Sequence, residues 1–340
     1  MKEVVKLVLL GERQNSLNLS LYFNKYPPTI IYPEVLEDRN KKLASPSGSQ
    51  RKISLLVLNQ GVLQFNKIKE TIEKSLPIET KVKLPQKAYE LYKKYYQDYT
   101  DMLNSLHAIT GKFKTQSRLV VGLGDESVYE TSIRLLRNYG VPYIPGSAIK
   151  GVTRHLTYYV LAEFINEGND FYKRAKTVQD AFMKGDPKEI LSNAKVPERC
   201  SRLCKEFLRI FGEKKVPEII DELIRIFGTQ KKEGEVVFFD AIPIAEEIAD
   251  KPILELDIMN PHYGPYYQSG EKNVPPPGDW YDPIPIFFLT VPKDVPFLVA
   301  VGGRDRELTE KAFSLVKLAL RDLGVGAKTS LGYGRLVEYV

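Results

Sequence analysis

The period of the hydrophobic positions changes along the chain, and the changes predict a mixture of helices and strands. Apolar residues three and four apart indicate six helices, with proline or serine near several of their starts and glycine after three of them. Short apolar runs indicate strands between these helices. The predicted helices cover residues 85–106, 147–164, 171–183, 198–211, 217–227 and 308–323. The predicted strands cover residues 112–122, 235–244, 331–339 and one or two segments within 284–300.

The order of these elements predicts the fold class. When residues 166–232 are set aside as a helical insertion, the chain from Lys112 onward is ordered strand, helix, strand, strand, helix, strand. This is the split βαβ order of an α+β, ferredoxin-like (RRM-like) fold. Residues 111–340 are therefore predicted to form this core. The aromatic signature of a standard RNA-recognition sheet is absent, and a fold alone does not determine a function.

Residues 1–110 are less regular and are predicted to form an N-terminal extension of mixed helix and strand. A strand is expected at residues 4–10 and a short aromatic segment at residues 18–26. Residues 34–52 are polar and contain Ser45-Pro46-Ser47-Gly48-Ser49, which is typical of a loop. In the helix at residues 85–106, five tyrosines form one stripe, and we expect it to pack against the core or a partner.

Composition excludes several classes of protein. The chain has 340 residues, of which 43% are hydrophobic, too many for a disordered protein. Its longest apolar runs fall short of the roughly 18 residues that a membrane span needs. Lys6 interrupts the first apolar stretch, which is therefore unlike a signal peptide. We expect a cytoplasmic protein.

Cysteine and histidine content argues against a metal site or cofactor. Cys200 and Cys204 are four apart, which on a helix is poor geometry for a disulfide. The sequence has three histidines, His107, His155 and His262, and no second Cys/His pair. We therefore expect reduced thiols, no bound metal and no cofactor.

Charge is distributed unevenly. The net charge is +6, but residues 1–120 carry 20 basic and 11 acidic residues, whereas residues 201–300 carry 11 basic and 17 acidic. Such polarity suits an anionic partner on one side and a protein partner on the other. A solvated acidic surface is the alternative for residues 201–300.

A glycine-rich loop, residues 324–335, follows the last helix. Glycines allow the backbone to approach a ligand, so that N–H groups can face phosphate oxygens. A nucleotide-binding P-loop is excluded because Ala327 precedes Lys328 and because the loop follows a helix instead of preceding one. A tight loop without a ligand is the alternative. The RNA-binding candidates in this loop are Gly326, Lys328, Thr329, Ser330, Tyr333 and Arg335.

A second candidate is the start of the helix at residues 147–164. Pro142, Pro145 and Gly146 precede it, and Ser147 is a favourable N-cap residue. The free N–H groups of a helix N-terminus attract anions. Lys150 and Arg154, four apart, share one face of this helix, for which a solvated basic surface is the alternative.

Basic side chains also follow the first predicted core strand. Lys112 and Lys114 alternate on one face, with Arg118 further along, which predicts a phosphate-binding track. A solvated strand edge is the alternative.

Residues 140–151 and 324–335 together closely resemble the RAMP superfamily of CRISPR-associated RNA-binding proteins. Phe239-Asp240-Ala241, followed by residues 257–267, is similar to the family of sixth subunits of the Cmr complex, the type III-B CRISPR effector. The resemblance covers most of residues 112–340. It implies a structural RNA-binding subunit that contacts the guide RNA (crRNA) near its 3′ end in antiviral defence.

The resemblance also implies partners. The subunit would cap a filament of backbone RAMP subunits, beside a second RAMP and small helical subunits, in a complex that recognises complementary target RNA. His262, Tyr263, Tyr266, Tyr267 and Trp280 lie in a proline- and glycine-rich stretch, residues 260–285, expected between two core strands. This stretch is predicted to form a projecting hairpin or loop, with His262 and Tyr263 as RNA contacts.

We expect a protein that is not an enzyme. The resemblance implies that backbone subunits cleave the target through an aspartate in the loop after the first core strand, and the comparable loop here contains Asp125. A carboxylate before a helix is more often a cap or a solvated charge. His155 and His262 have no evident nucleophile partner. The alternatives are a metal-independent or metal-dependent endoribonuclease using Asp125 or His262, and a scaffold that touches no RNA.

Overall fold

The computed structural model describes residues 81–339 apart from 127–130, 166–169, 185–186, 269–273, 279 and 283–284. The elements predicted within residues 4–58 lie outside the described residues. The chain divides into two compact units, each built from separate stretches of sequence. Within the described part, unit one contains residues 81–92, 122–142 and 248–292, and unit two contains the remainder. The predicted boundary at residue 110 stays a prediction.

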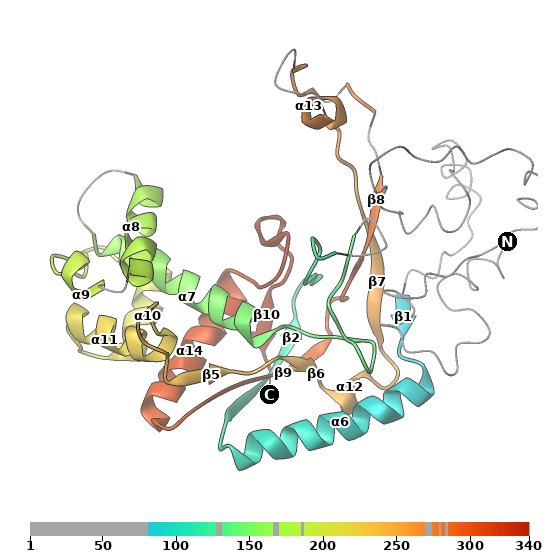
Figure 1. Cartoon of the computed structure of the whole chain (residues 1–340), viewed down its shortest axis with the longest axis horizontal. Helices are drawn as coiled ribbons and strands as arrows, with labels where there is room; N and C mark the ends of the chain where they lie inside the picture. The colour runs from blue at the N-terminus through green and yellow to red at the C-terminus, as the bar shows by residue number, and fades with distance from the viewer. Residues whose placement is uncertain are drawn as a thin grey trace, which may run out of the picture. The chain divides into compact units, whose positions relative to one another are not determined.

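An antiparallel sheet covered by helices forms the centre of unit two, which is therefore a mixed α+β structure (Figure 1). The strand order is β10–β2–β9–β5, and the short β6 also pairs with β9. Helix α7 follows β2 in sequence, and helix α14 connects β9 to β10. The bounds are β2 Ile109–Thr115, α7 Gly146–Glu163, β5 Val236–Phe238, β6 Ile242–Pro243, β9 Pro296–Gly303, α14 Arg306–Asp322 and β10 Leu336–Glu338.

Packing between α14 and the sheet explains the residues at their contact. Phe113 of β2 meets Phe313 of α14 edge to face, with the ring centroids 6.1 Å apart. A Cβ atom at Gly111 would lie 2.6 Å from the Phe313 ring, so glycine at this position permits the close approach. Asp305 caps α14 by accepting a hydrogen bond from the Leu308 N–H at 3.1 Å.

Several predicted strands are shorter than expected or divided. The strand predicted at 235–244 is split into β5 and β6, and the one at 331–339 begins only at Leu336. The cause of the late start is a turn: Lys328, Gly332 and Gly334 all have positive φ angles, which extended strands do not use. The strand predicted at 112–122 begins at Ile109 and ends at Thr115.

The helices between α7 and β5 largely agree with those predicted at residues 171–183, 198–211 and 217–227. They are α8 (Phe171–Lys184), α9 (Pro187–Ile190), α10 (Arg202–Phe211) and α11 (Val216–Phe227). Helix α10 begins four residues later than predicted because Ser201 is its N-cap and accepts a hydrogen bond from the Cys204 N–H. The short α9 has no counterpart among the predicted helices, although it begins with Pro187 and proline is favourable at a first helical position.

Ion pairs join α10 and α11 to α14. Lys311 of α14, with a side chain only 10% exposed, contacts Glu222 of α11 at 2.8 Å and Glu307 at 2.7 Å. Arg321 of α14 contacts Glu206 of α10 at 2.6 Å. Arg225 of α11 contacts the cap Asp305 at 2.8 Å. Part of the acidic excess in residues 201–300 therefore neutralises basic side chains of the same chain.

Unit one contains a separate antiparallel sheet of order β1–β7–β8 and a two-stranded pair, β3–β4. The stretch 260–285 lies between β7 and β8 and carries the short helix α13 (Figure 1). The expectation that core strands flank this stretch is wrong, because β8 and β9, predicted together within 284–300, belong to different sheets. The bounds are β1 Lys81–Lys83, β3 Leu135–Leu136, β4 Val141–Pro142, β7 Pro252–Met259, α13 Gly264–Gln268 and β8 Ile286–Thr290.

Helix α6 (Gln86–Ser105) confirms the predicted helix, and its tyrosines pack as expected. Tyr92 is fully buried, and Tyr96 is 8% exposed. Burial and the negative charges of Glu246 and Glu247 raise the pKa of Tyr96 to about 12. Both glutamates lie in the short helix α12 (Ala245–Ile248). In the described part of the chain, no helix is long and apolar enough to cross a membrane.

The Lys311 cluster is expected to contribute strongly to stability. Substitution Glu222→Ala leaves a buried ammonium with only one carboxylate and should lower the free energy of unfolding by about 3 kcal/mol. Glu307→Ala is the matched control, because the Glu307 side chain is 74% exposed although it binds the same lysine. Its effect should be much smaller. Chemical denaturation measures both, and equal losses would contradict this assignment.

Candidate functional site

The glycine-rich loop and the segment after β2 form one structure. The Gly334 N–H donates to the Arg118 carbonyl at 2.7 Å, and the Ala327 N–H donates to the Val120 carbonyl at 2.8 Å. In the reverse direction, the Gln116 N–H donates to the Arg335 carbonyl at 2.8 Å. Two basic segments that were predicted separately are therefore joined through their backbones. We call residues 116–120 together with 324–335 the loop platform.

Two glycines of the loop platform are required by the chain itself. A Cβ atom at Gly326 would lie 2.3 Å from the Val120 carbonyl oxygen, and one at Gly334 would lie 2.0 Å from the Val325 carbonyl oxygen. Both residues also have positive φ angles, of 96° and 77°. Gly326 was predicted as a residue that admits a phosphate, but the approach it permits here is that of protein backbone.

Side chains of the loop platform remain accessible. Arg118, Ser330 and Arg335 are exposed, whereas Lys328, Thr329 and Tyr333 are half-buried. The Arg335 side chain forms no ion pair with any residue that the structure describes. Lys328 has a left-handed backbone (φ 61°, ψ 26°) and precedes the short 3₁₀ helix Thr329–Leu331. The platform therefore offers basic and hydroxyl groups from two segments on a backbone fixed by hydrogen bonds.

Lys112 and Lys114 share one face of β2 as predicted, because they alternate with the buried Phe113 and Thr115. Both have partners in unit two. Lys112 lies 3.5 Å from a carboxylate oxygen of Glu247, and the Lys114 ammonium lies 5.7 Å from the centroid of the Tyr339 ring. The same carboxylate accepts a hydrogen bond from the Tyr339 hydroxyl at 2.8 Å. The predicted phosphate track is thus partly neutralised within the protein.

The start of α7 differs from the prediction. The helix begins at Gly146, with Pro145 as its N-cap, and Ser147 is an exposed residue of the first turn that is not the cap. The Gly146 N–H donates to a carboxylate oxygen of Asp240 at 2.7 Å. A Cβ atom at Gly146 would lie 2.0 Å from the Phe238 carbonyl oxygen, so the segment after β5 packs directly against the helix start.

The anion at this helix end is therefore a side chain of the protein. Asp240 occupies the position predicted for a phosphate, and its own carbonyl accepts a hydrogen bond from the Tyr99 hydroxyl at 2.8 Å. In the sequence, Asp240 stands out only as part of the family motif Phe239-Asp240-Ala241. Asp240 is 94 residues from Gly146 in the sequence, so no local sequence pattern could predict their contact.

Lys150 and Arg154 are half-buried on α7. Burial, and then the positive charge of Arg154, lowers the pKa of Lys150, while Glu233 opposes the shift. The Arg154 guanidinium lies 6.0 Å from the centroid of the Tyr158 ring, one turn further along α7. Its buried Nε has no hydrogen-bond partner among the described residues. The two cations lie one turn apart as predicted, but neither is fully exposed to solvent.

His262, Tyr263 and Asp125 belong to unit one. The His262 Nδ1 atom lies 3.3 Å from the Tyr281 carbonyl oxygen, in the stretch between β7 and β8. Asp125 forms an ion pair with Arg134, whose Nε donates to the carboxylate at 3.0 Å. No group of three or more His, Cys, Asp or Glu side chains in the described ranges is arranged to hold a metal ion.

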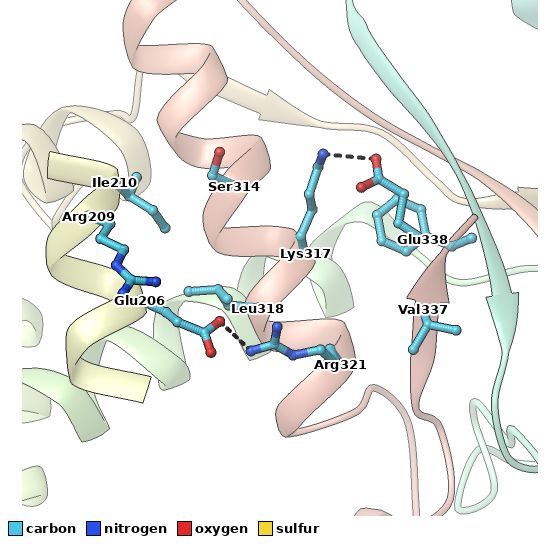
Figure 2. A pocket seen from close by; sticks show the side chains of 10 residues that line it. Glu206, Arg209, Ile210, Ser314, Lys317, Leu318, Arg321, Val337 and Glu338 are labelled. Carbon is cyan, nitrogen blue, oxygen red and sulfur yellow. Dashed lines mark hydrogen bonds and ion pairs between the residues drawn. The ribbon is translucent and has the colours of Figure 1, made fainter. Parts of the chain in front are cut away.

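Figure 2 shows a depression of about 500 Å³ on unit two, where side chains of α10, α14 and β10 meet. Its charged groups are mostly paired: Arg321 contacts Glu206, and Lys317 contacts Glu338 at 2.8 Å. Arg209 is exposed at its edge without an ion-pair partner among the described residues. Because paired charges occupy most of its lining, the depression is a weak candidate for an anion site.

Comparison with known proteins decides the family. The model of the RAMP superfamily matches residues 112–337, which include the loop platform and α7. The crystal structure of Cmr6 from Pyrococcus furiosus is 99% identical in sequence and covers 69% of this chain and 98% of its own, with a TM-score of 0.55. The chain belongs to the RAMP superfamily, in the Cmr6 family.

More distant Cmr proteins are also similar to this chain. The CRISPR system CMR subunit Cmr6 of Saccharolobus solfataricus is 21% identical over 330 residues, which cover 94% of this chain and 90% of that protein. A chain in the cryo-EM structure of the type III-B Cmr-beta bound to cognate target RNA is 19% identical, with a TM-score of 0.53. It covers 99% of this chain and 96% of its own, and it shows a shared fold.

The close backbone contact of the Cmr6-family loop can be tested with two glycine substitutions. Gly332 has a positive φ of 91° but nothing within 4 Å of a Cβ, so Gly332→Ala should cost about 1–2 kcal/mol of unfolding free energy. Gly334→Ala should cost about 1–3 kcal/mol more than Gly332→Ala, because its added Cβ also overlaps the Val325 carbonyl oxygen. Urea denaturation distinguishes the two, and a Gly334→Ala loss no larger than that of Gly332→Ala would contradict the contact.

Proposed function

We propose that this chain is a non-catalytic, RNA-binding structural subunit of a type III-B CRISPR (Cmr) complex. The observation that carries the proposal is the loop platform, which unites Arg118, Lys328 and Arg335 on one fixed backbone. The order β10–β2–β9–β5, with a helix after β2 and another after β9, supports a ferredoxin-like RAMP core. Residues 1–110 would extend this core.

The platform suits an RNA backbone more than a base edge. Arginine and lysine side chains with neighbouring hydroxyl groups provide charge-assisted hydrogen bonds to phosphate oxygens. Ser330 and Thr329 supply such hydroxyls beside Lys328. Contacts to phosphate fix the position of a nucleic acid and carry little sequence information. We therefore propose that the subunit positions the guide RNA, towards its 3′ end, without selecting its sequence.

The family supports the proposed assembly. Cmr proteins similar to this chain include a chain in a structure of type III-B Cmr-beta bound to cognate target RNA. By this relationship, the partners would be guide RNA, target RNA, the backbone RAMP subunits, a second RAMP at the 3′ end and a small helical subunit. The chain would cap the backbone filament in cytoplasmic antiviral defence.

The contacts of the candidate catalytic groups favour a structural role. The Asp125 carboxylate accepts a hydrogen bond from the Arg134 guanidinium, so its oxygens already have a partner in the protein. His262 directs one ring nitrogen at a backbone carbonyl. An endoribonuclease using Asp125 or His262 would have to free these groups before they could move a proton.

Charge removal from the platform tests RNA binding. The variant Lys328→Ala with Arg335→Ala should bind a fluorescein-labelled single-stranded oligouridine more weakly than the unmodified chain. If both residues contact phosphate, the slope of log K against log salt should fall by about 1.4. Lys205→Ala with Arg209→Ala is a control of equal charge from α10. Identical affinities and slopes for the two variants would contradict the platform as a phosphate site.

Incubation with labelled RNA tests the absence of catalysis. The full chain, with guide-repeat or target RNA and with or without Mg²⁺, should leave the RNA intact on a denaturing gel. Cleavage that is lost in Asp125→Ala or His262→Ala would overturn the non-catalytic assignment and favour an endoribonuclease. Cleavage that survives both substitutions points to a contaminating nuclease, which a repeat purification under denaturing conditions and refolding would remove.

A further inference from the structure

The start of α8 combines exposed aromatic and basic side chains. Its first six residues are Phe171-Tyr172-Lys173-Arg174-Ala175-Lys176, and the whole helix has four basic residues against the single acidic Asp180. Helix α8 packs against α7 within unit two (Figure 1). We call His155 and Tyr159 of α7, together with Phe171, Tyr172, Lys173 and Lys176, the α8 surface.

Three rings of the α8 surface form a ladder that links the two helices. The His155 ring meets the Tyr159 ring edge to face, with centroids 4.5 Å apart. The Tyr159 and Phe171 rings are nearly parallel, at 8°, with centroids 5.9 Å apart. The Arg174 guanidinium lies 5.7 Å from the Phe171 centroid, and its Nη1 donates to the Ile165 carbonyl at 2.9 Å. These contacts hold the ladder in a fixed position.

Tyr172, next to the ladder, has no such partner. The residue is 75% exposed, and its ring stacks on no other ring in the described part of unit two. A large, solvent-exposed aromatic ring is informative when it lies among other exposed apolar groups, and Phe171 beside it is itself 39% exposed. One turn of helix separates Tyr172 from Lys176, so both side chains lie on the same face of α8.

The lysines of this surface are also unpaired. Lys173 and Lys176 are exposed and form no ion pair with any described residue. On α10, α11 and α14, by contrast, Arg202, Arg225 and Lys311 all contact carboxylates. Among the described residues at the start of α8, the acidic Asp170 is engaged as a cap, because its carboxylate accepts a hydrogen bond from the Tyr172 N–H at 3.0 Å. Within the part of the chain that the structure describes, no carboxylate compensates the charge of Lys173 and Lys176.

We propose that the α8 surface is a second binding site for single-stranded RNA, separate from the loop platform. Tyr172 provides a ring on which one base stacks, and Lys173 and Lys176 contact the flanking phosphates. The ring ladder from His155 to Phe171 keeps the first turn of α8 in place and extends the aromatic surface. This inference rests on the proposed RNA-binding function but uses no residue of the loop platform.

The chemistry of the surface favours RNA over an acidic protein segment. Every base has a flat face, so a single exposed ring next to two cations suits a nucleotide of any sequence. An acidic peptide would need the lysines but not the aromatic ring. A requirement for the Tyr172 ring would therefore distinguish RNA from an acidic peptide as the ligand.

Fluorescence anisotropy with the full chain and a labelled single-stranded oligouridine tests the site. Tyr172→Ala should weaken binding by about 5- to 100-fold, the effect of losing one base–aromatic stack. Tyr172→Phe keeps the ring and should bind as the unmodified chain does. Lys173→Gln with Lys176→Gln should lower the salt slope by about 1.4, and Lys205→Gln with Lys215→Gln is the charge-matched control.

A second measurement does not depend on affinity. Photocrosslinking with a 5-iodouridine oligonucleotide should label the peptide that contains Tyr172 in the unmodified chain. Unchanged affinity in Tyr172→Ala, with no crosslink at this peptide, would overturn the inference. Equal weakening in Tyr172→Phe and Tyr172→Ala would overturn the stacking role. If Tyr172→Ala instead impairs only co-purification with other Cmr subunits, the surface binds protein and the inference is wrong.

The platform variant separates this inference from the proposed function. Weak binding by Lys328→Ala with Arg335→Ala, alongside normal binding by all α8 variants, would sustain the loop platform and overturn the α8 site. The reverse pattern would sustain the α8 site and overturn the platform. Normal binding by both sets would overturn both, and losses in each would support two separate contacts.

Discussion

Unit two depends on a backbone contact that only glycine permits. Gly326 allows the loop after α14 to lie against the segment after β2, where a Cβ would overlap the Val120 carbonyl oxygen, and Gly334 allows the loop to pack against its own Val325. Hydrogen bonds to the Arg118 and Val120 carbonyls then hold the two segments together. Because these residues sit at the two ends of the folded core in sequence, the same contact ties β2 to the α14–β10 connection. This backbone contact therefore fixes the relative positions from which the Arg118, Lys328 and Arg335 side chains extend.

Charge in this protein is best understood by asking which cations already have partners. Lys112 has Glu247, Lys311 has Glu222 and Glu307, and the start of α7 has Asp240. These contacts neutralise charges within the protein, although the net charge still counts them. Arg335, Lys173 and Lys176 are different, because no described carboxylate neutralises them. The net charge of +6 therefore does not show which cations are neutralised within the protein.

Local patterns predicted the elements well and their partners poorly. Helices such as α6, α7 and α14 followed from apolar periodicity and from stop signals like Gly324. The identity of the N-terminal partner of α7 did not, because Asp240 is distant in sequence and only packing brings it to Gly146. For the same reason, the sequence does not show that β8 and β9 belong to different sheets. The apolar pattern of two consecutive strands does not reveal which sheet each one joins. Phe171-Tyr172-Lys173-Arg174 was visible as sequence, but its significance required knowing which rings and charges stay exposed.

The helices between α7 and β5 are held to the rest of unit two by different kinds of contact. Ion pairs join α10 and α11 to α14. Helix α8 makes its main contacts with α7 instead, through rings. A helix held mainly by aromatic packing does not need its lysines for stability, so Lys173 and Lys176 remain available to bind. Helices joined to α14 by ion pairs, together with a helix whose Lys173 and Lys176 form no ion pair with described residues, suit the proposed subunit, which would contact both protein neighbours and a nucleic acid.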